Sequence, residues 1–192
     1  MKKINFPRSE GVAVAREIVR VLEPCCSRLI VAGSLRRRKN EVGDVEILYI
    51  PKRVRAVDPS DLFQQTVMVN ETDKVIEDLL AKEILTKRLN VNGSETWGPE
   101  NKLSVHRFSG IPVDLFSTNE ACWFNYVVCR TGGADTNTRI ATQANKKGWK
   151  WNPYGPGFTQ LPSHGHGKFR VACEQDVFSF VCLPYQEPWE RL

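Results

Sequence analysis

The sequence has no apolar run of the length that a membrane span requires, which is about 18 residues or more. The two lysines at its start are followed by no apolar stretch long enough for a secretory signal. It also holds no Cys-x-x-Cys pair, only three histidines and no long low-complexity tract. These absences argue against a membrane protein, a zinc site and a disordered chain. They predict an intracellular protein, in the cytoplasm or nucleoid, with no membrane partner.

What is present fits an ordinary globular protein. The 192 residues are enough for one domain with a full core, or for two small lobes that share a cleft. The net charge of +5 is compatible with a polyanionic partner, and its distribution is more informative. Four consecutive cations stand at Arg36–Lys39, and residues 130–150 carry five cations against one acid. The six cysteines are predicted to be reduced residues of the core, because most have apolar neighbours.

The spacing of apolar residues predicts an α+β fold. Helical periodicity covers residues 9–22, with Ser9 as the N-cap, and also residues 71–89. Strands are predicted at 29–32 and 44–50, followed by a hairpin that turns at Ser109-Gly110, whereas 53–65 is expected to be irregular. After Ser117 the pattern changes to two helices around "RTGG", short strands and a final helix near "EQDVFSFV". We therefore expect a first lobe, residues 1–118, with a mixed sheet and flanking helices, and a small α/β second lobe, residues 119–192.

Three carboxylates fall in predicted strands. Asp44 and Glu46 alternate along one strand, so they point to one face while Val45 and Ile47 point to the other. Asp114 lies in the middle of the second strand of the hairpin. Carboxylates packed together repel one another unless a cation lies between them. Oxygen ligands without His or Cys favour Mg²⁺, with Mn²⁺ as a substitute, so we expect two such ions at these three residues.

A Gly-Ser pair, Gly33-Ser34, follows the strand directly upstream of these acids. Glycine lets backbone N–H groups approach a phosphate closely, the serine donates a hydroxyl, and Arg36 or Arg37 can neutralise the charge. Each part has an ordinary structural explanation: Gly-Ser is common, acids one residue apart usually face solvent, and a basic run is usually a solvated loop. Their order along the chain favours a triphosphate site beside a metal site, and hence phosphoryl or nucleotidyl transfer.

That ordered combination resembles the nucleotidyltransferase superfamily of DNA polymerase beta, whose hallmark is Gly-Ser, a spacer, an acid-x-acid strand and a third acid on a later strand. The stretch "GSLRRRKNEVGDVEIL" is similar in particular to family X DNA polymerases. "RTGGADTN" resembles their nucleotide-binding turn, and "ACEQDVFSFVCLPYQEPWER" resembles their closing segment. The similarity runs from about Phe6 to Arg191 and implies a minimal form with a palm and a thumb. Such a reduced form would suit a virus or a mobile element.

The resemblance implies a role for each candidate residue. Asp44 and Glu46 would hold both metals, and Asp114 would ligate the catalytic metal and help to deprotonate the primer 3′-hydroxyl. The residues that would bind the nucleotide are Gly33, Ser34, Arg37, Gly132, Gly133 and Asn137. Ser34 and Arg37 would bind the outgoing phosphates, and Gly132, Gly133 and Asn137 would pack against the sugar and base. DNA would be held by the basic second lobe, at Arg139, Lys146 and Lys147. The implied partners are a dNTP and primer-template or gapped DNA, bound by a monomer.

The sequence departs from the family pattern at three places. Glu46 stands where the family usually has Asp, and Cys129-Arg130 replaces an aromatic pair. Ala141 stands where the family often has an Arg that reaches the template, and only Arg139 lies nearby. Three hypotheses therefore stay open. The first is a DNA polymerase that adds a deoxynucleoside monophosphate to a primer 3′-hydroxyl, as in short-gap repair. The others are a template-independent nucleotidyltransferase acting on nucleic acid or protein, and an inactive nucleic-acid-binding module.

Overall fold

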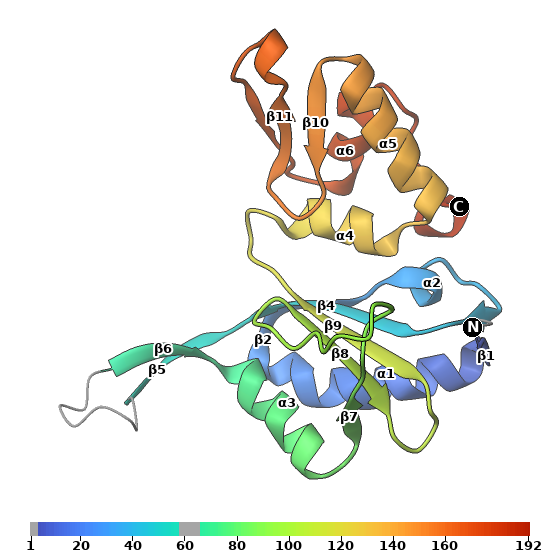
Figure 1. The fold of residues 1–192 in the computed structure, drawn as a ribbon, viewed down its shortest axis with the longest axis vertical. Coiled ribbons are helices and arrows are strands. Elements are labelled where there is room, and N and C mark those ends of the chain that lie inside the picture. The colour runs from blue at the N-terminus through green and yellow to red at the C-terminus, as the bar shows by residue number, and fades with distance from the viewer. Residues whose placement is uncertain (1–3, 58–65) are drawn as a thin grey trace.

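The computed structural model describes residues 4–57 and 66–192. Its centre is a five-stranded mixed sheet in the order β2-β4-β9-β8-β7, in which β4 and β9 are parallel and the other neighbours antiparallel (Figure 1). The strands are β2 (Cys26–Val31), β4 (Val45–Pro51), β7 (Leu85–Lys87), β8 (Asn101–His106) and β9 (Pro112–Ser117). The α+β class and the mixed sheet are therefore confirmed.

Two helices cover one face of this sheet, α1 (Arg8–Leu22) and α3 (Glu71–Ala81) (Figure 1). Helix α1 turns the stripe Val14, Ala15, Ile18 and Leu22 inward because these positions recur at helical spacing. They pack against the β4 and β9 side chains that point the same way: Val45, Ile47, Tyr49, Val113 and Leu115. The alternate side chains of β4 and β9 therefore face the other side, toward the second lobe.

Small elements surround this sheet. Strand β1 (Phe6–Pro7) pairs with β3 (Glu41–Val42), and the short helix α2 (Gly33–Arg36) follows β2. Strands β5 (Arg53–Val57) and β6 (Thr66–Asn70) form a separate antiparallel ribbon that extends away from the sheet (Figure 1). The prediction of irregular structure from residue 53 is thus wrong for 53–57, and residues 58–65 lie outside the described residues. A 3₁₀ turn, Glu23–Cys25, connects α1 to β2.

The second lobe begins with α4 (Trp123–Thr131), which packs on Leu48, Ile50 and Phe116 of the sheet and so joins the two lobes. It continues with helix α5 (Ala134–Lys146), a three-stranded antiparallel sheet and helix α6 (Glu174–Phe180). The strands are β10 (Trp149–Asn152), β11 (Gly157–Gln160) and β12 (Lys168–Arg170), and 3₁₀ turns cover Pro162–His164 and Pro188–Glu190. A boundary at residue 118 stays a prediction. No described helix is long and apolar enough to cross a membrane.

Three local predictions need correction. The helix predicted over 71–89 ends at Ala81, because Glu83 adopts a left-handed φ of 55° and the chain reverses into β7. Helix α1 begins at Arg8 with Pro7 at the N-cap position, so Ser9 lies inside the helix and does not cap it. All six cysteines are free, yet Cys26 is buried whereas Cys182 is exposed, so the core assignment is wrong for Cys182.

Candidate active site

The three predicted carboxylates come together on the face of the sheet that points to the second lobe. Glu46 and Asp114 are Cα partners in the parallel pair of β4 and β9, so their side chains project side by side. Val45 and Ile47 are fully buried on the opposite face, which confirms the alternation predicted for this strand. Asp44 directly precedes β4, and its charge acts on both other carboxylates.

Burial and repulsion by neighbouring carboxylates change how readily Glu46 and Asp114 ionise. Burial, with the neighbouring charges of Asp44 and Asp114, raises the pKa of Glu46 to about 7. Burial also raises the pKa of Asp114 above its ordinary value, although a hydrogen bond from Arg88 opposes the shift. Ionisation of the acids at this site therefore costs free energy, and a positive charge placed among the three carboxylates would offset it.

The Gly-Ser pair lies directly against this acidic site. Gly33 has a left-handed φ of 58°, and a Cβ atom built on it would lie 2.1 Å from Oε2 of Glu46, so another residue would be strained and would displace the Glu46 carboxylate. The Ser34 hydroxyl is buried and makes no hydrogen bond within the described part of the chain. A buried hydroxyl without a partner is costly, and it leaves a donor for an oxygen of a ligand.

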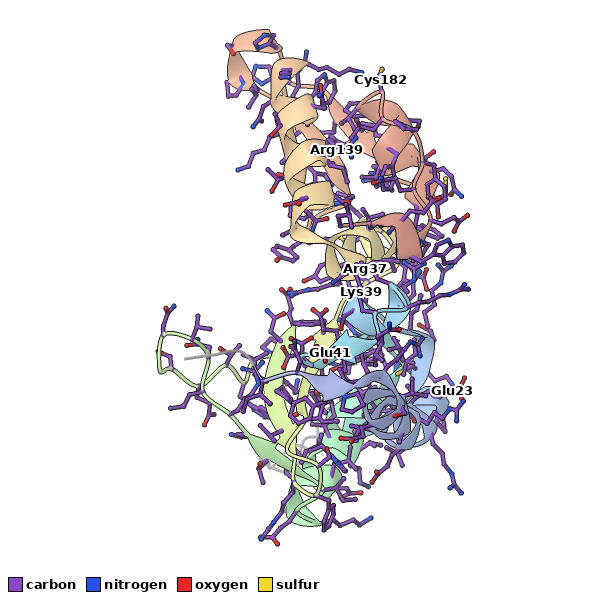
Figure 2. The ribbon with its side chains drawn as sticks, turned by 90° about the vertical axis from the view of Figure 1, so that its right-hand side faces the viewer. Glu23, Arg37, Lys39, Glu41, Arg139 and Cys182 are labelled. Atoms are coloured by element: carbon purple, nitrogen blue, oxygen red, sulfur yellow. The ribbon has the colours of Figure 1, made fainter. Side chains whose placement is uncertain are left out.

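The basic run that follows joins the two lobes. Arg36 donates to the Thr131 hydroxyl at 2.6 Å and forms an ion pair with Glu174 of α6 at 2.5 Å. Arg37 donates to the Thr131 carbonyl, and Figure 2 shows it at the junction of the lobes. The guanidinium of Arg38 lies 4.0 Å from the centre of the Trp189 ring. Of the two arginines that could neutralise a phosphate, Arg36 is thus already paired with Glu174, which leaves Arg37 as the candidate.

Arg37 differs from its neighbours because it also belongs to the acidic site. Burial lowers the pKa of Arg37, and the charges of Glu46 and Asp44 act in the opposite direction. A Cβ atom built on Gly132 would lie 3.1 Å from the Nη1 atom of Arg37, so Gly33–Arg37 and the "RTGG" turn meet at this point. The structure thus brings Arg37 to both the carboxylates and the predicted nucleotide turn.

The other predicted nucleotide contacts are enclosed. Gly132 and Gly133 are buried, and a Cβ atom on Gly133 would lie 2.0 Å from the carbonyl carbon of Leu192. The amide of Asn137 donates to the Cys129 carbonyl at 2.9 Å, and its Oδ1 atom is buried with no hydrogen-bond partner among the described residues. Asn137 therefore has an acceptor available, whereas Gly133 is covered by the backbone of Leu192.

The predicted DNA contacts differ in their availability. Arg139, Lys146 and Lys147 are all exposed on or just after α5. Figure 2 shows Arg139 on the helix between the lobe junction and the far end of the second lobe. Lys147 lies at that far end, where its ammonium donates to the Phe180 carbonyl and to the Cys182 sulfur, each at 2.9 Å. Lys147 is thus engaged within its own lobe.

Two family models account for most of the chain. The model of the DNA polymerase beta palm matches residues 5–112, and the model of the DNA polymerase beta thumb matches residues 126–192. The palm match alone covers more than half of the chain. The chain belongs to the DNA polymerase beta family. This places it among family X polymerases and nucleotidyltransferases, for which DNA and nucleotides are the implied substrates. No curated protein matches the chain.

One palm residue at the site was missed by the sequence analysis. The Nη2 atom of Arg88 donates to both Asp114 oxygens, at 2.6 and 2.8 Å. Arg88 follows β7 and its backbone pairs with Leu103, which is in turn the strand partner of Asp114. Sequence gives no signal for this contact because it depends on the register of three strands. Arg88 engages both oxygens that Asp114 would offer to a metal.

A thumb residue, Arg130, also reaches the acids. Its guanidinium carbon lies 3.5 Å from the centre of the Phe116 ring and 5.2 Å from that of Tyr154. Its charge lowers the pKa of Glu46 and Asp114, against the larger effect of burial. The sequence marks Arg130 as a departure from the aromatic pair of the family, and the structure shows a cation held between two aromatic rings.

The donor chemistry suits a hard divalent cation. Asp44, Glu46 and Asp114 offer carboxylate oxygens, which are the ligands that Mg²⁺ prefers, and a nearby cation would oppose the effect of burial on the pKa of Glu46. Yet among the described residues no three His, Cys, Asp or Glu side chains are arranged to hold a metal together. Each oxygen of Asp114 has a further lone pair, so the acid can accept from Arg88 and still offer an oxygen to a metal shared with Asp44 and Glu46.

Proposed function

We propose that the protein is a metal-dependent nucleotidyltransferase that transfers a deoxynucleoside monophosphate from a dNTP to a primer 3′-hydroxyl. One observation carries the proposal: Glu46 and Asp114 project side by side on parallel strands, within the field of Asp44. Three neighbouring carboxylates lie beside the Ser34 hydroxyl, which is buried and has no hydrogen-bond partner among the described residues, and this arrangement suits a metal-bound triphosphate.

Each residue then has a defined task. Asp44, Glu46 and Asp114 would hold two Mg²⁺ ions, which when bound would stabilise the charge that develops on the attacking and leaving oxygens. The primer 3′-oxygen forms a bond to the α-phosphorus, the bond to the leaving pyrophosphate breaks, and the hydroxyl proton is lost. We assign acceptance of that proton to Asp114, as the resemblance to the family implies. Ser34 and Arg37 would bind the outgoing phosphates through a hydroxyl and a guanidinium.

Incorporation of a single nucleotide into a one-nucleotide gap tests this proposal. The substrate is offered each dNTP separately with Mg²⁺ or Mn²⁺, and Asp114→Asn is compared with the unchanged protein. Asp78→Asn is the matched control, because Asp78 is an exposed acid of α3 on the opposite side of the sheet. We expect Asp114→Asn to lose incorporation with its circular dichroism unchanged, and Asp78→Asn to retain it. Undiminished incorporation by Asp114→Asn would refute the assignment.

A second candidate function is template-independent transfer, and one observation favours it. Ala141, at the position where the family often has a template-reaching Arg, is half-buried against the core of the thumb. The position therefore presents no cation to a template strand. Equal incorporation on an unpaired primer and in the gap would support this function, whereas preference for the complementary nucleotide in the gap would support the templated one. If the protein incorporates no nucleotide on either substrate but binds DNA tightly, an inactive nucleic-acid-binding module is supported.

A further inference from the structure

The five-stranded sheet has an open edge at β2. Among the described residues, β2 pairs with β4 on one side and with no strand on the other. Leu29, Ile30 and Val31 of this edge are only half-buried. An apolar strand with one unpaired edge can accept a further strand from another polypeptide.

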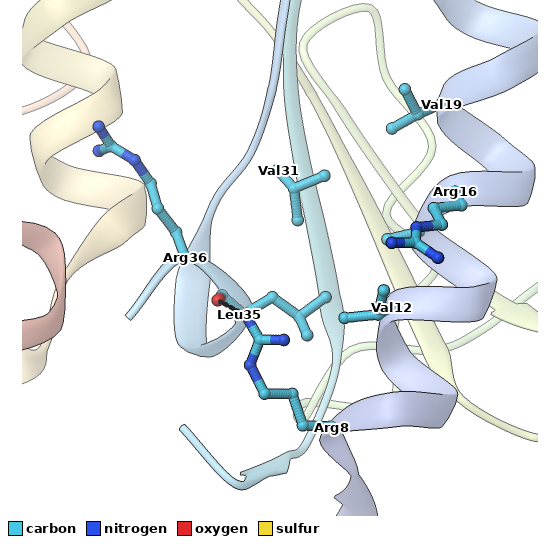
Figure 3. A pocket seen from close by; sticks show the side chains of 8 residues that line it. Arg8, Val12, Arg16, Val19, Val31, Leu35 and Arg36 are labelled. Atoms are coloured by element: carbon cyan, nitrogen blue, oxygen red, sulfur yellow. Dashed lines mark hydrogen bonds between the residues drawn. The ribbon is translucent and has the colours of Figure 1, made fainter. Parts of the chain in front are cut away.

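A groove lies beside this edge, between α1 and α2 (Figure 3). It encloses about 260 Å³, and its walls are mostly apolar: Val12 and Val19 from α1, Val31 from the end of β2, and Leu35 from α2. Leu29 and Val31 pack against the same core cluster as α1, so this side of β2 continues into the groove. The space is sufficient for one or two aliphatic or aromatic side chains.

The charge around the groove has one sign. Among the described residues, its lining includes Arg8, Arg16 and Arg36 and no acid. Arg36 points away from it in Figure 3 and is neutralised by Glu174, which leaves Arg8 and Arg16 on the α1 side. Arg16 is exposed and forms no ion pair with any described residue, and Arg8 donates to the Leu35 carbonyl at 3.2 Å. An apolar hollow with a cationic border is complementary to an apolar segment that carries acids.

We propose that this surface, which we call the β2 groove, binds an extended acidic and apolar peptide segment of a partner protein. The segment adds a strand to the free edge of β2, places an apolar side chain in the hollow and presents acidic side chains to Arg8 and Arg16. The β2 groove lies at the edge of the sheet, between α1 and α2, and none of the three carboxylates lines it. This inference does not depend on the proposed function.

A display library of twelve-residue peptides tests the proposal with the full chain. One set has two central apolar positions flanked by Asp or Glu, a second has the same centre flanked by Lys, and a third has acidic flanks with a polar centre. We expect enrichment of the first set alone, and amide shift changes on binding that map to α1, β2 and α2. Enrichment of another set, or changes that map elsewhere, would overturn the proposal.

Two variants and one modified peptide sharpen the test. Arg16→Glu should weaken binding of the selected peptide about fivefold, which is near the upper limit for the contribution of one exposed ion pair. Arg20→Glu is the matched control, because Arg20 is exposed one turn further along α1 and does not line the groove. Methylation of alternate backbone nitrogens of the peptide should abolish binding, because it removes the hydrogen bonds to β2. Equal binding by Arg16→Glu, insensitivity to N-methylation, or displacement by duplex DNA would each contradict a peptide docked on β2.

Discussion

Replacing Glu46 by Gln should change the pH dependence of folding in a way that isolates the acidic site. The pKa of Glu46 is about 7 in the folded protein, against an ordinary value of 4.5. Between these values the folded chain binds the proton more tightly than the unfolded chain does. The contribution of Glu46 to stability is therefore fully present below about pH 4.5 and is lost as the pH rises through 7.

The size of the effect follows from the same two values. Each unit of pKa difference corresponds to about 1.4 kcal/mol, so between pH 5 and pH 8 the protein should lose about 2.5 kcal/mol of unfolding free energy through this one residue. Gln at position 46 has no proton to lose, and its unfolding free energy should lack this component. Without metal, the difference in unfolding free energy between Glu46→Gln and the unchanged protein should therefore shift by about 2.5 kcal/mol in favour of the variant as the pH rises from 5 to 8.

Urea unfolding in the presence of a chelator measures this difference, with the two proteins compared at pH 5, 6, 7 and 8. A second series with Mn²⁺ adds an independent reading, because a cation among the acids should stabilise the unchanged protein at pH 8 more than the variant. Parallel pH profiles for the two proteins would refute the reasoning, because they would mean that Glu46 ionises in the folded state as easily as in the unfolded state.

Three further substitutions test other contacts of the site. Gly33→Ala should cost at least about 1–2 kcal/mol in thermal unfolding, because alanine resists a left-handed φ and its Cβ would collide with Glu46; an unchanged melting temperature would contradict this geometry. Glu174→Gln should lower the unfolding free energy by about 3–5 kcal/mol, because it leaves the largely buried Arg36 and Arg191 without their anion; a loss below 1 kcal/mol in urea unfolding would show that these ion pairs contribute little. Arg88→Met should tighten Mn²⁺ binding, measured by electron paramagnetic resonance without nucleotide, because it removes a positive charge that competes with the metal for Asp114; weaker binding would mean that Arg88 orients the acid for the metal.

Local patterns predict several elements of the fold. Helix α1, strand β4, the β8–β9 hairpin and helix α5 all follow from helical or strand spacing over a single segment. The same logic places Asp44 and Glu46 on one face, because alternation is a property of one strand. It fails after Ala81, where apolar residues continue at helical spacing but the left-handed turn at Glu83 redirects the chain. Such a turn has no counterpart in apolar periodicity.

Contacts that depend on strand register or on lobe packing do not follow from local pattern, so the sequence groups the three acids only through their chemistry and the family resemblance. Glu46 and Asp114 are neighbours because β4 and β9 are parallel, and nothing in either segment specifies that pairing. Arg88 reaches Asp114 across β8, which is an equally remote relationship. The basic run at Arg36 reads as a phosphate loop in sequence because Glu174 lies 138 positions away. Charge alone cannot indicate whether a cation faces a ligand or a distant acid.

The bridge from Arg36 through Glu174 to Arg191 has a consequence for how the chain folds. The core of the palm is built from residues between Val14 and Leu115, so it can form while the thumb is still being synthesised. The bridge closes only when positions 174 and 191 are present, and it closes a loop of well over a hundred residues. Closing a loop of this length costs chain entropy, and only the contacts formed afterwards offset that cost. Docking of the thumb should therefore be the last event of folding, and its rate should depend on the charge of Glu174.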